Sequence, residues 1–200
     1  RFEQTAFAQC MAGTAARNRI YLFFATREMG KTGNTGTDTE SPVARVGGKK
    51  DLYGELGVSP RVAVIGAGSM GTGIAQAVLT ARLPVVMIDK DPAAVAKARE
   101  RIAASLQKRV SQGRLSPQRM EETMGSLTAA SDWPAIAQAD LVIEAVFEDA
   151  AVKQAVLRSA EAAVGPGAIL ATNTSTISLD VLAEGLARPE RLVGLHFFNP

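Results

Sequence analysis

The stretch that most constrains the fold is RVAVIGAGSMGTGIAQAVLTA, residues 61–81. It begins with the apolar, β-branched run VAVI at residues 62–65, which is typical of a buried parallel strand. A Gly-x-Gly-x-x-Gly turn follows at residues 66–71, and a helical pattern continues from Thr72. The order strand, glycine turn, helix is the fingerprint of a dinucleotide-binding βαβ unit. An ordinary strand-to-helix turn is the alternative, because glycine-rich turns are common.

Each residue of this turn has a predicted role. Gly66 permits the tight turn, Gly68 lets a pyrophosphate approach a backbone that has no Cβ, and Gly71 lets the helix pack closely on the strand. The free N–H groups of the first helical turn, which includes Ser69 and Met70, receive the phosphate charge. The sequence therefore predicts that these five residues bind a cofactor.

A second predicted strand, residues 85–88, is followed by Asp89, which lies 18 positions after Gly71. That spacing suits the acid that accepts hydrogen bonds from the adenosine ribose hydroxyls. A carboxylate there repels a 2′-phosphate, so NAD is favoured over NADP. The alternative is a turn or capping role for Asp89, because Asp91 and Pro92 begin the next helix.

Strands and helices alternate along the rest of the chain. Further strands are predicted at residues 127–130, 140–146 and 168–172, and residues 192–197 are predicted to be a sixth strand or its exit. Helices are predicted at residues 92–110, 117–124, 150–164 and 178–186, and Asp132 is predicted to cap a short helix. This alternation predicts an α/β fold, a Rossmann-type doubly wound, mostly parallel sheet over residues 60–200. A helical segment at residues 1–31 and a Gly-, Thr- and Ser-rich linker at residues 32–59 are expected to precede it.

The composition limits the classes of function. Acids and bases are interspersed and the net charge is only +2, so we expect no nucleic-acid or membrane-surface partner. No apolar run approaches the roughly 18 residues that cross a bilayer. The single cysteine, Cys10, excludes an internal disulfide framework and fits a reducing cytoplasm. The sequence predicts a cytoplasmic protein with no metal site.

Polar side chains follow the carboxyl ends of the later strands. Glu148, residues 173–176 and His196 should meet at the sheet edge that holds the glycine turn, where doubly wound sheets bind ligands. His196 is the chain's only histidine, and an imidazole can take an alcohol proton as a hydride leaves. A histidine packed at a strand end is an equally good interpretation. Glu144, within a strand, is either a buried, paired carboxylate or a structural acid.

Four segments together resemble the L-3-hydroxyacyl-CoA dehydrogenase family. The two at residues 170–178 (LATNTSTIS) and 188–200 (RPERLVGLHFFNP) are more specific than those at 62–73 (VAVIGAGSMGTG) and 141–153 (LVIEAVFEDAAVK). The resemblance covers about residues 60–200. It implies NAD-dependent oxidation of the 3-hydroxyl of an acyl-CoA to a ketone in fatty-acid β-oxidation.

The resemblance also implies roles on the substrate side. His196 matches the general base, and Ser175 matches the serine that hydrogen-bonds the substrate oxygen. Asn173 borders the substrate and the nicotinamide. Ser105 falls where some members contact the CoA, although this match is poor. The glutamate that orients the family's histidine, and the helical domain that completes the acyl-CoA site, are expected beyond residue 200, so the 200 residues alone should bind NAD but turn over little.

On the cofactor side, Glu148 and Lys153 match family positions near the nicotinamide end of NAD, and Asp89 matches the ribose acid. Residues 2–31 more loosely resemble the helical segment between the enoyl-CoA hydratase and dehydrogenase parts of bacterial multifunctional β-oxidation proteins. This implies a hydratase domain upstream, a substrate and dimerisation domain downstream, and a thiolase subunit as the partner in a hetero-oligomeric complex.

Three alternatives stay open. One is a free-standing 3-hydroxybutyryl-CoA dehydrogenase with an unusual leader, and another is a non-catalytic NAD-binding relative. A 6-phosphogluconate or 2-hydroxy-acid dehydrogenase also uses such a glycine turn, but it gives no reason for the NTSTI and HFFNP segments at residues 173–177 and 196–200.

Overall fold

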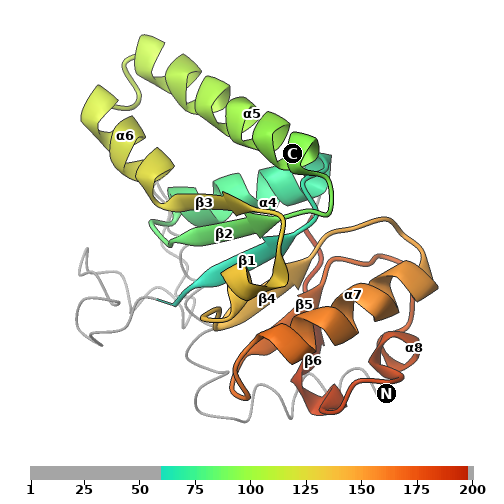
Figure 1. Cartoon of the computed structure of the whole chain (residues 1–200). Helices are drawn as coiled ribbons and strands as arrows, with labels where there is room; N and C mark the ends of the chain where they lie inside the picture. The colour runs from blue at the N-terminus through green and yellow to red at the C-terminus, as the bar shows by residue number, and fades with distance from the viewer. Residues whose placement is uncertain (1–59, 198–200) are drawn as a thin grey trace, which may run out of the picture.

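The computed structural model of the chain describes residues 60–197, which form alternating strands and helices (Figure 1). The strands are β1 (Val62–Ile65), β2 (Val85–Ile88), β3 (Leu127–Ala130), β4 (Leu141–Glu144), β5 (Ile169–Thr172) and β6 (Leu192–Gly194). The α-helices are α4 (Ser69–Thr80), α5 (Pro92–Ser111), α6 (Pro117–Gly125), α7 (Ala150–Ala163) and α8 (Leu179–Ala183). Two 3-10 helices are η2 (Trp133–Ile136) and η3 (Pro189–Arg191). The predicted helical segment 1–31, the linker 32–59 and residues 198–200 lie outside the described part.

The strands form one sheet in the order β3-β2-β1-β4-β5-β6, and every neighbouring pair is parallel. This order confirms the predicted doubly wound fold. In register, Ile65 lies between Ile88 and Glu144, and Glu144 lies between Ile65 and Thr172. The carboxyl ends of all six strands therefore lie at one edge of the sheet.

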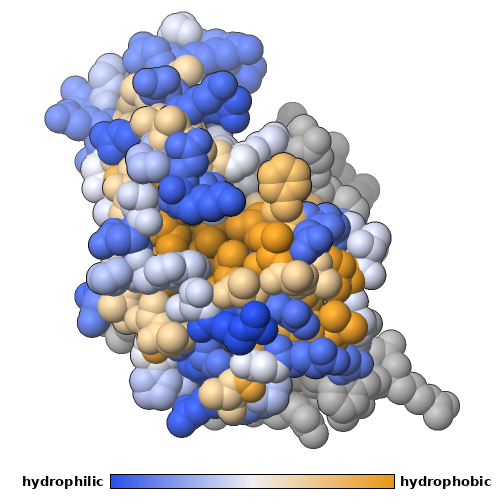
Figure 2. Space-filling model, turned by 45° about the vertical axis from the view of Figure 1, so that its right-hand side comes forward, coloured by the Kyte–Doolittle hydropathy of each residue, from blue (hydrophilic) through white to orange (hydrophobic). Residues whose placement is uncertain are grey.

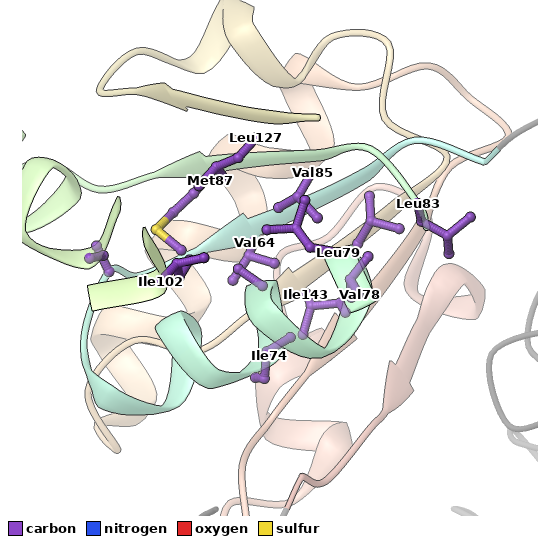
Figure 3. Close-up of a cluster of buried hydrophobic side chains, with 14 of the residues drawn as sticks. Val64, Ile74, Val78, Leu79, Leu83, Val85, Met87, Ile102, Leu127 and Ile143 are labelled. Atoms are coloured by element: carbon purple, nitrogen blue, oxygen red, sulfur yellow. The ribbon is translucent and has the colours of Figure 1, made fainter. Parts of the chain in front are cut away.

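Helices cover both faces of the sheet. The core on one face joins α4 and α5 to the strands, and Figure 3 shows Ile74 and Val78 of α4 close to Val64 and Ile143. The core on the other face joins α7, α8 and η2 to the same strands. Because side chains pointing both ways are covered, all four residues of β1 are buried, which explains its unbroken apolar sequence. No helix among residues 60–197 is long and apolar enough to cross a membrane.

Several predicted boundaries were wrong, and strand pairing explains some of them. The strand predicted at residues 140–146 ends at Glu144, because its neighbours β1 and β5 end at the register partners Ile65 and Thr172. The helix predicted to begin at Thr72 begins at Ser69, inside the glycine turn. The helix predicted at residues 178–186 is shorter, because α8 spans only Leu179–Ala183. Residues 192–197, predicted to be a strand or its exit, form a strand as far as Gly194.

A carboxylate on α7 fastens the segment that leads into β6. Glu161 accepts hydrogen bonds from the backbone N–H groups of Ala187 (2.7 Å) and Arg188 (2.9 Å), and from Arg191 Nη2 (3.1 Å). Burial by itself raises the pKa of Glu161, but the Ala187 and Arg188 N–H groups and the Arg191 guanidinium outweigh burial and lower the pKa below 4.5. The entry to β6, and with it the segment carrying His196, is thereby tied to α7.

Replacing this carboxylate should reduce stability in a pH-dependent way. A carboxyl whose pKa is lower in the folded state stabilises the fold above its unfolded pKa, and this stabilisation is lost as the pH falls through the folded pKa. We expect Glu161→Gln to lower the free energy of unfolding by about 2 kcal/mol at pH 7. The deficit should shrink below pH 4.5, the ordinary pKa of the group.

The measurement is urea unfolding at several pH values. Glu184→Gln, which changes an exposed acid next to α8, is the control and should leave the urea midpoint unchanged. A deficit for Glu161→Gln that stays constant down to pH 3 would contradict the assignment.

Candidate functional site

Two glycines of the turn between β1 and α4 are required by the packing of the chain itself. Gly66 has a φ of +106°, and a Cβ added to it would lie 2.6 Å from the carbonyl oxygen of Ala145. A Cβ on Gly71 would lie 1.8 Å from the carbonyl oxygen of Gly66. These contacts agree with the predicted roles, a tight turn at Gly66 and close packing of the helix at Gly71.

Gly68 is different, because its own protein surroundings do not require a glycine. A Cβ added there would meet no atom within 4 Å, and its φ is −69°. Gly68 is also the N-cap of α4, which has no side-chain cap. The other described α-helices are capped by side chains of Asp91, Ser116, Asp149 and Ser178. Open space beside uncapped N–H donors fits an anionic phosphate group.

Asp89 lies against this turn, in partial burial. Its Oδ2 accepts a hydrogen bond from Ala67 N (2.8 Å), and its Oδ1 accepts one from Asp91 N (3.0 Å). The cap of α5 is Asp91, which accepts from Ala93 N (2.9 Å). Each carboxylate oxygen of Asp89 has further acceptor capacity, as a ligand bearing hydroxyl donors requires. The structure thus brings the predicted ribose acid and the predicted phosphate turn together.

The end of β4 carries a buried ion pair. Glu144 is fully buried, and Lys153 of α7 is 1% exposed. Lys153 Nζ lies 2.8 Å from Glu144 Oε1 and 3.1 Å from Oε2. Thr172 donates its hydroxyl to Glu144 Oε2 (2.6 Å), and Val146 N donates to Oε1 (2.7 Å). The sequence interpretation of Glu144 as a buried, paired carboxylate is confirmed, and its partner is one of the predicted cofactor residues.

Glu148 joins this pair to the loop at residues 173–176. Glu148 Oε2 lies 3.3 Å from Lys153 Nζ. Its Oε1 accepts hydrogen bonds from the Thr174 hydroxyl, from Ser175 N (3.1 Å) and from the Thr176 hydroxyl (3.1 Å). Burial acts to raise the pKa of Glu148, but the Thr174 and Ser175 donors and the Lys153 charge prevail and lower it to about 2. An ionised Glu148 therefore anchors this loop throughout the neutral pH range.

Asn173 connects the same loop to the chain that leaves β6. Its Oδ1 accepts a hydrogen bond from Phe197 N (2.7 Å), and Leu195 N donates to the carbonyl oxygen of Thr172 (2.9 Å). His196 lies between these two anchored residues, and its side chain is exposed. The segments of Glu148, Asn173, Ser175 and His196 thus meet at the predicted edge of the sheet.

This edge also has an apolar part. Figure 2 turns toward the viewer the side of Figure 1 at which the strands end, and apolar side chains gather in the middle of that face between polar ones. Phe147, three residues after the end of β4, is 87% exposed. An apolar surface beside a few fixed polar groups is typical of small-molecule sites.

One predicted residue is not brought to this edge. Ser105 lies on α5, where its hydroxyl accepts a hydrogen bond from Gln76 Nε2 of α4 (2.7 Å). It follows the Asp91 cap by 14 positions, or about 20 Å along the helix axis. Its contact with CoA stays a prediction from the resemblance.

The sequence predicted residues 173–176 at this edge only as a segment, and it did not predict that the Thr172 hydroxyl contacts Glu144 or that the Thr174 hydroxyl contacts Glu148. Thr172 is the last residue of β5, and Thr174 begins a run of hydroxyl side chains at residues 174–176. The signal was present, because Glu148 follows the neighbouring strand and carboxylates accept such donors. The sequence does not give the register of β4 against β5, which determines which hydroxyl group contacts which carboxylate.

Comparison with known proteins identifies the family. The family described as "3-hydroxyacyl-CoA dehydrogenase, NAD binding domain" matches residues 61–200. The chain belongs to this family. Its cofactor is NAD, which confirms the prediction from the glycine turn and Asp89.

Relatives of this NAD-binding domain include the fatty acid oxidation complex subunit alpha of Pseudomonas paraeruginosa. It is 36% identical over 199 residues, 99% of this chain and 26% of that protein, so the chain spans about a quarter of the curated relatives it matches first. The 3-hydroxybutyryl-CoA dehydrogenase of Escherichia coli K12 is 40% identical with a TM-score of 0.69, over 72% of this chain and 30% of that one. The (S)-3-hydroxybutyryl-CoA dehydrogenase of Ralstonia eutropha is 36% identical with a TM-score of 0.68, over 72% and 50%.

The two types of glycine in the NAD-binding turn should respond differently to alanine. We expect Gly68→Ala to leave the free energy of unfolding within about 0.5 kcal/mol of wild type, because the added Cβ meets no protein atom. The same change should weaken NAD binding about tenfold, because the methyl group would occupy the space that the glycine fingerprint predicts for the pyrophosphate.

Gly71→Ala is the matched comparison. Its Cβ would overlap a backbone oxygen, so we expect it to lower the free energy of unfolding by about 3 kcal/mol or more. Urea unfolding gives the stability of both variants, and calorimetric titration with NAD gives the affinity. Normal NAD affinity in Gly68→Ala would contradict the phosphate assignment of this turn.

Proposed function

We propose that the chain supplies the NAD site and the catalytic base of an L-3-hydroxyacyl-CoA dehydrogenase. The reaction is oxidation of L-3-hydroxyacyl-CoA to 3-oxoacyl-CoA in fatty-acid oxidation. The observation that carries the proposal is the meeting of three segments, those of Glu148, Ser175 and His196, beside the glycine turn at one sheet edge. The names of the relatives, a fatty acid oxidation complex subunit and two 3-hydroxybutyryl-CoA dehydrogenases, support it.

The reaction removes a hydride and a proton from the secondary alcohol. Bound NAD would supply the acceptor for the hydride that leaves C3 of the substrate. His196 takes the hydroxyl proton on a ring nitrogen as the C3–O bond becomes a carbonyl, so the two electrons and the two hydrogens are accounted for. An exposed imidazole, which can accept a proton on one ring nitrogen and return it, suits this transfer in either direction.

The neighbouring residues of the chain bind and orient the substrate. The Ser175 hydroxyl donates a hydrogen bond to the substrate oxygen, which strengthens as negative charge develops on that oxygen. Asn173 holds the backbone beside His196 through its contact with Phe197 N (2.7 Å). Glu148 fixes the loop that presents Ser175, and with Lys153 it lies near the nicotinamide end of the cofactor site.

We further propose that the chain is part of a multifunctional α subunit, in which residues 1–31 end a hydratase domain and residues 32–59 are a linker. The 36% identity to a complex subunit alpha extends over 199 residues, well beyond the family's NAD-binding domain. A thiolase subunit would be the partner, in the cytoplasm. A gene that encodes no hydratase upstream of residue 1 would favour the free-standing 3-hydroxybutyryl-CoA dehydrogenase instead.

The direct test uses the full-length protein with acetoacetyl-CoA and NADH. We expect loss of NADH absorbance that depends on acetoacetyl-CoA. No oxidation of NADH by a protein that binds NAD normally would favour the non-catalytic relative.

His196→Gln in the full-length protein should separate proton transfer from cofactor binding. General-base catalysis contributes about 10²–10⁴-fold, so kcat should fall by about that factor. The affinity for NAD should change less than about twofold, because the glycine turn and Asp89 are untouched. Steady-state kinetics and calorimetric titration measure the two quantities. A variant with normal kcat would show that the base lies elsewhere.

Asp89→Ala should alter the choice of cofactor. Loss of the ribose acceptor should weaken NAD about tenfold, and loss of the negative charge should narrow the preference for NAD over NADP. Asp91→Ala is the control, because it removes the α5 cap at a cost of about 1 kcal/mol and leaves the ribose acceptor in place. Steady-state kinetics give kcat/KM with NAD and with NADP. If the ratio of these two kcat/KM values is unchanged in Asp89→Ala, the ribose acid lies elsewhere.

A further inference from the structure

One buried side chain touches several of the segments that meet at the sheet edge without lying on the surface itself. Glu144 is the last residue of β4, where the sheet changes its direction of winding. Its register partners are Ile65, which precedes the glycine turn, and Thr172, which precedes Asn173. The backbone of Glu144 therefore lies between the cofactor turn and the loop at residues 173–176.

The side chain of Glu144 holds the beginning of that loop. The Thr172 hydroxyl donates to Glu144 Oε2 (2.6 Å), and the same hydroxyl oxygen accepts a hydrogen bond from Thr174 N (3.4 Å). Asn173 N donates to the Glu144 carbonyl oxygen (2.9 Å). The first residues of the loop are thus fastened to Glu144 by side chain and backbone together.

The side chain of Glu144 also holds the end of the loop, through two further groups. It fixes the ammonium of Lys153, which lies 3.3 Å from Glu148 Oε2, and the other oxygen of Glu148 accepts from Ser175 N and Thr176 N. One buried carboxylate consequently restrains both ends of a loop that is itself exposed at Ser175.

Within residues 60–197, each group that contacts this carboxylate is a hydrogen-bond donor: Lys153 Nζ on both oxygens, Val146 N and the Thr172 hydroxyl. A glutamine has the same length, but it has one acceptor oxygen and an NH₂ group that only donates. In Glu144→Gln the NH₂ group meets donors, and Lys153 loses its buried anionic partner. The lysine is then drawn toward Glu148, the only other carboxylate within 4 Å of it among residues 60–197.

We infer that Glu144 is a positioning residue of the dehydrogenase, which acts through Thr172 and through Lys153 and Glu148 to fix the loop at residues 173–176. The inference rests on the proposed function, because it assigns Glu144 to the reaction in which Asn173 and Ser175 take part. Glu144 touches neither substrate nor cofactor. Its effect reaches the reaction through the placement of the loop and, from Asn173, of the backbone beside His196.

The test compares three variants of the full-length protein. Glu144→Gln disturbs both connections to the loop. Thr172→Val removes only the hydroxyl link, keeps the ion pair and has nearly the same shape. Thr123→Val is the control, because it removes a hydroxyl that donates to the Arg119 carbonyl oxygen within α6 (2.7 Å), away from the strand ends.

Three quantities are measured: kcat and KM with acetoacetyl-CoA and NADH, the affinity for NAD, and amide hydrogen exchange of residues 173–177. For Glu144→Gln we expect kcat to fall about 100-fold, the loss typical of a misplaced reacting group, with NAD affinity changed less than about threefold. Exchange in residues 173–177 should be about tenfold faster, with exchange in β1 and α4 unchanged. Thr172→Val should also lower kcat and speed exchange in residues 173–177, but by smaller factors than Glu144→Gln. Thr123→Val should match wild type in all of these measurements.

Several results would overturn the inference. Unchanged exchange in residues 173–177 in both Glu144→Gln and Thr172→Val would show that the loop does not depend on Glu144. Faster exchange spread evenly over β1, α4 and the loop, together with weaker NAD binding, would show a purely structural acid. If Glu144→Gln does not fold, Thr172→Val alone decides by the same criteria. A wild-type protein that does not oxidise NADH contradicts the proposed function, whereas loop exchange still reports on the positioning.

Discussion

The parallel pairing of β1, β4 and β5 is the constraint on which the site depends. Because Ile65, Glu144 and Thr172 are partners in register, the three strands end at the same level of the sheet. The segments that follow these strands therefore all begin at the carboxyl edge of the sheet. The glycine turn, Glu148 and the loop at residues 173–176 meet for this reason, although about eighty residues separate the first from the second.

The two sides of this edge are built for opposite tasks. On the β1 side, α4 presents backbone N–H groups without a side-chain cap, beside a glycine that has open space around it. Such a surface suits the binding of an anion. On the β4–β5 side, two carboxylates and one lysine satisfy one another and the neighbouring hydroxyl and N–H groups. The polar groups of that side are held by one another within the protein, which suits the proposed role of keeping reacting groups in place.

The sequence predicted the parts of this structure that local patterns determine. The bounds of β1, β2 and β3 agree with the predicted strands, and Asp89 lies against the glycine turn as its spacing from Gly71 required. The prediction that polar segments meet at one edge followed from strand order alone. Strand ends were less well predicted for β4 and β6, because apolar residues continue beyond the last paired residue.

Contacts between side chains that are distant in the chain could not be predicted from the sequence. Lys153 lies nine residues after Glu144, and this spacing predicts no contact within a single helix or strand. The two residues meet because α7 packs back over the end of β4. A fully buried lysine is also unexpected, since ammonium groups are almost never buried unless paired. Glu161 is another example, because its partners at residues 187, 188 and 191 are distant in the chain and become neighbours through the path into β6.

The buried ion pair is a costly way to fill the space between β4 and α7. Desolvation of two charges offsets most of their attraction, and apolar side chains of similar volume are often as stable or more so. Stability is therefore a weak reason for Glu144 and Lys153. What apolar residues lack is direction: they pack equally well in several arrangements, whereas a carboxylate that receives four hydrogen bonds fixes its donors in one. Two of those donors, Thr172 and Lys153, lead to opposite ends of the same loop. A positioning role accounts for both the burial of the pair and its place at the point where the sheet reverses its winding.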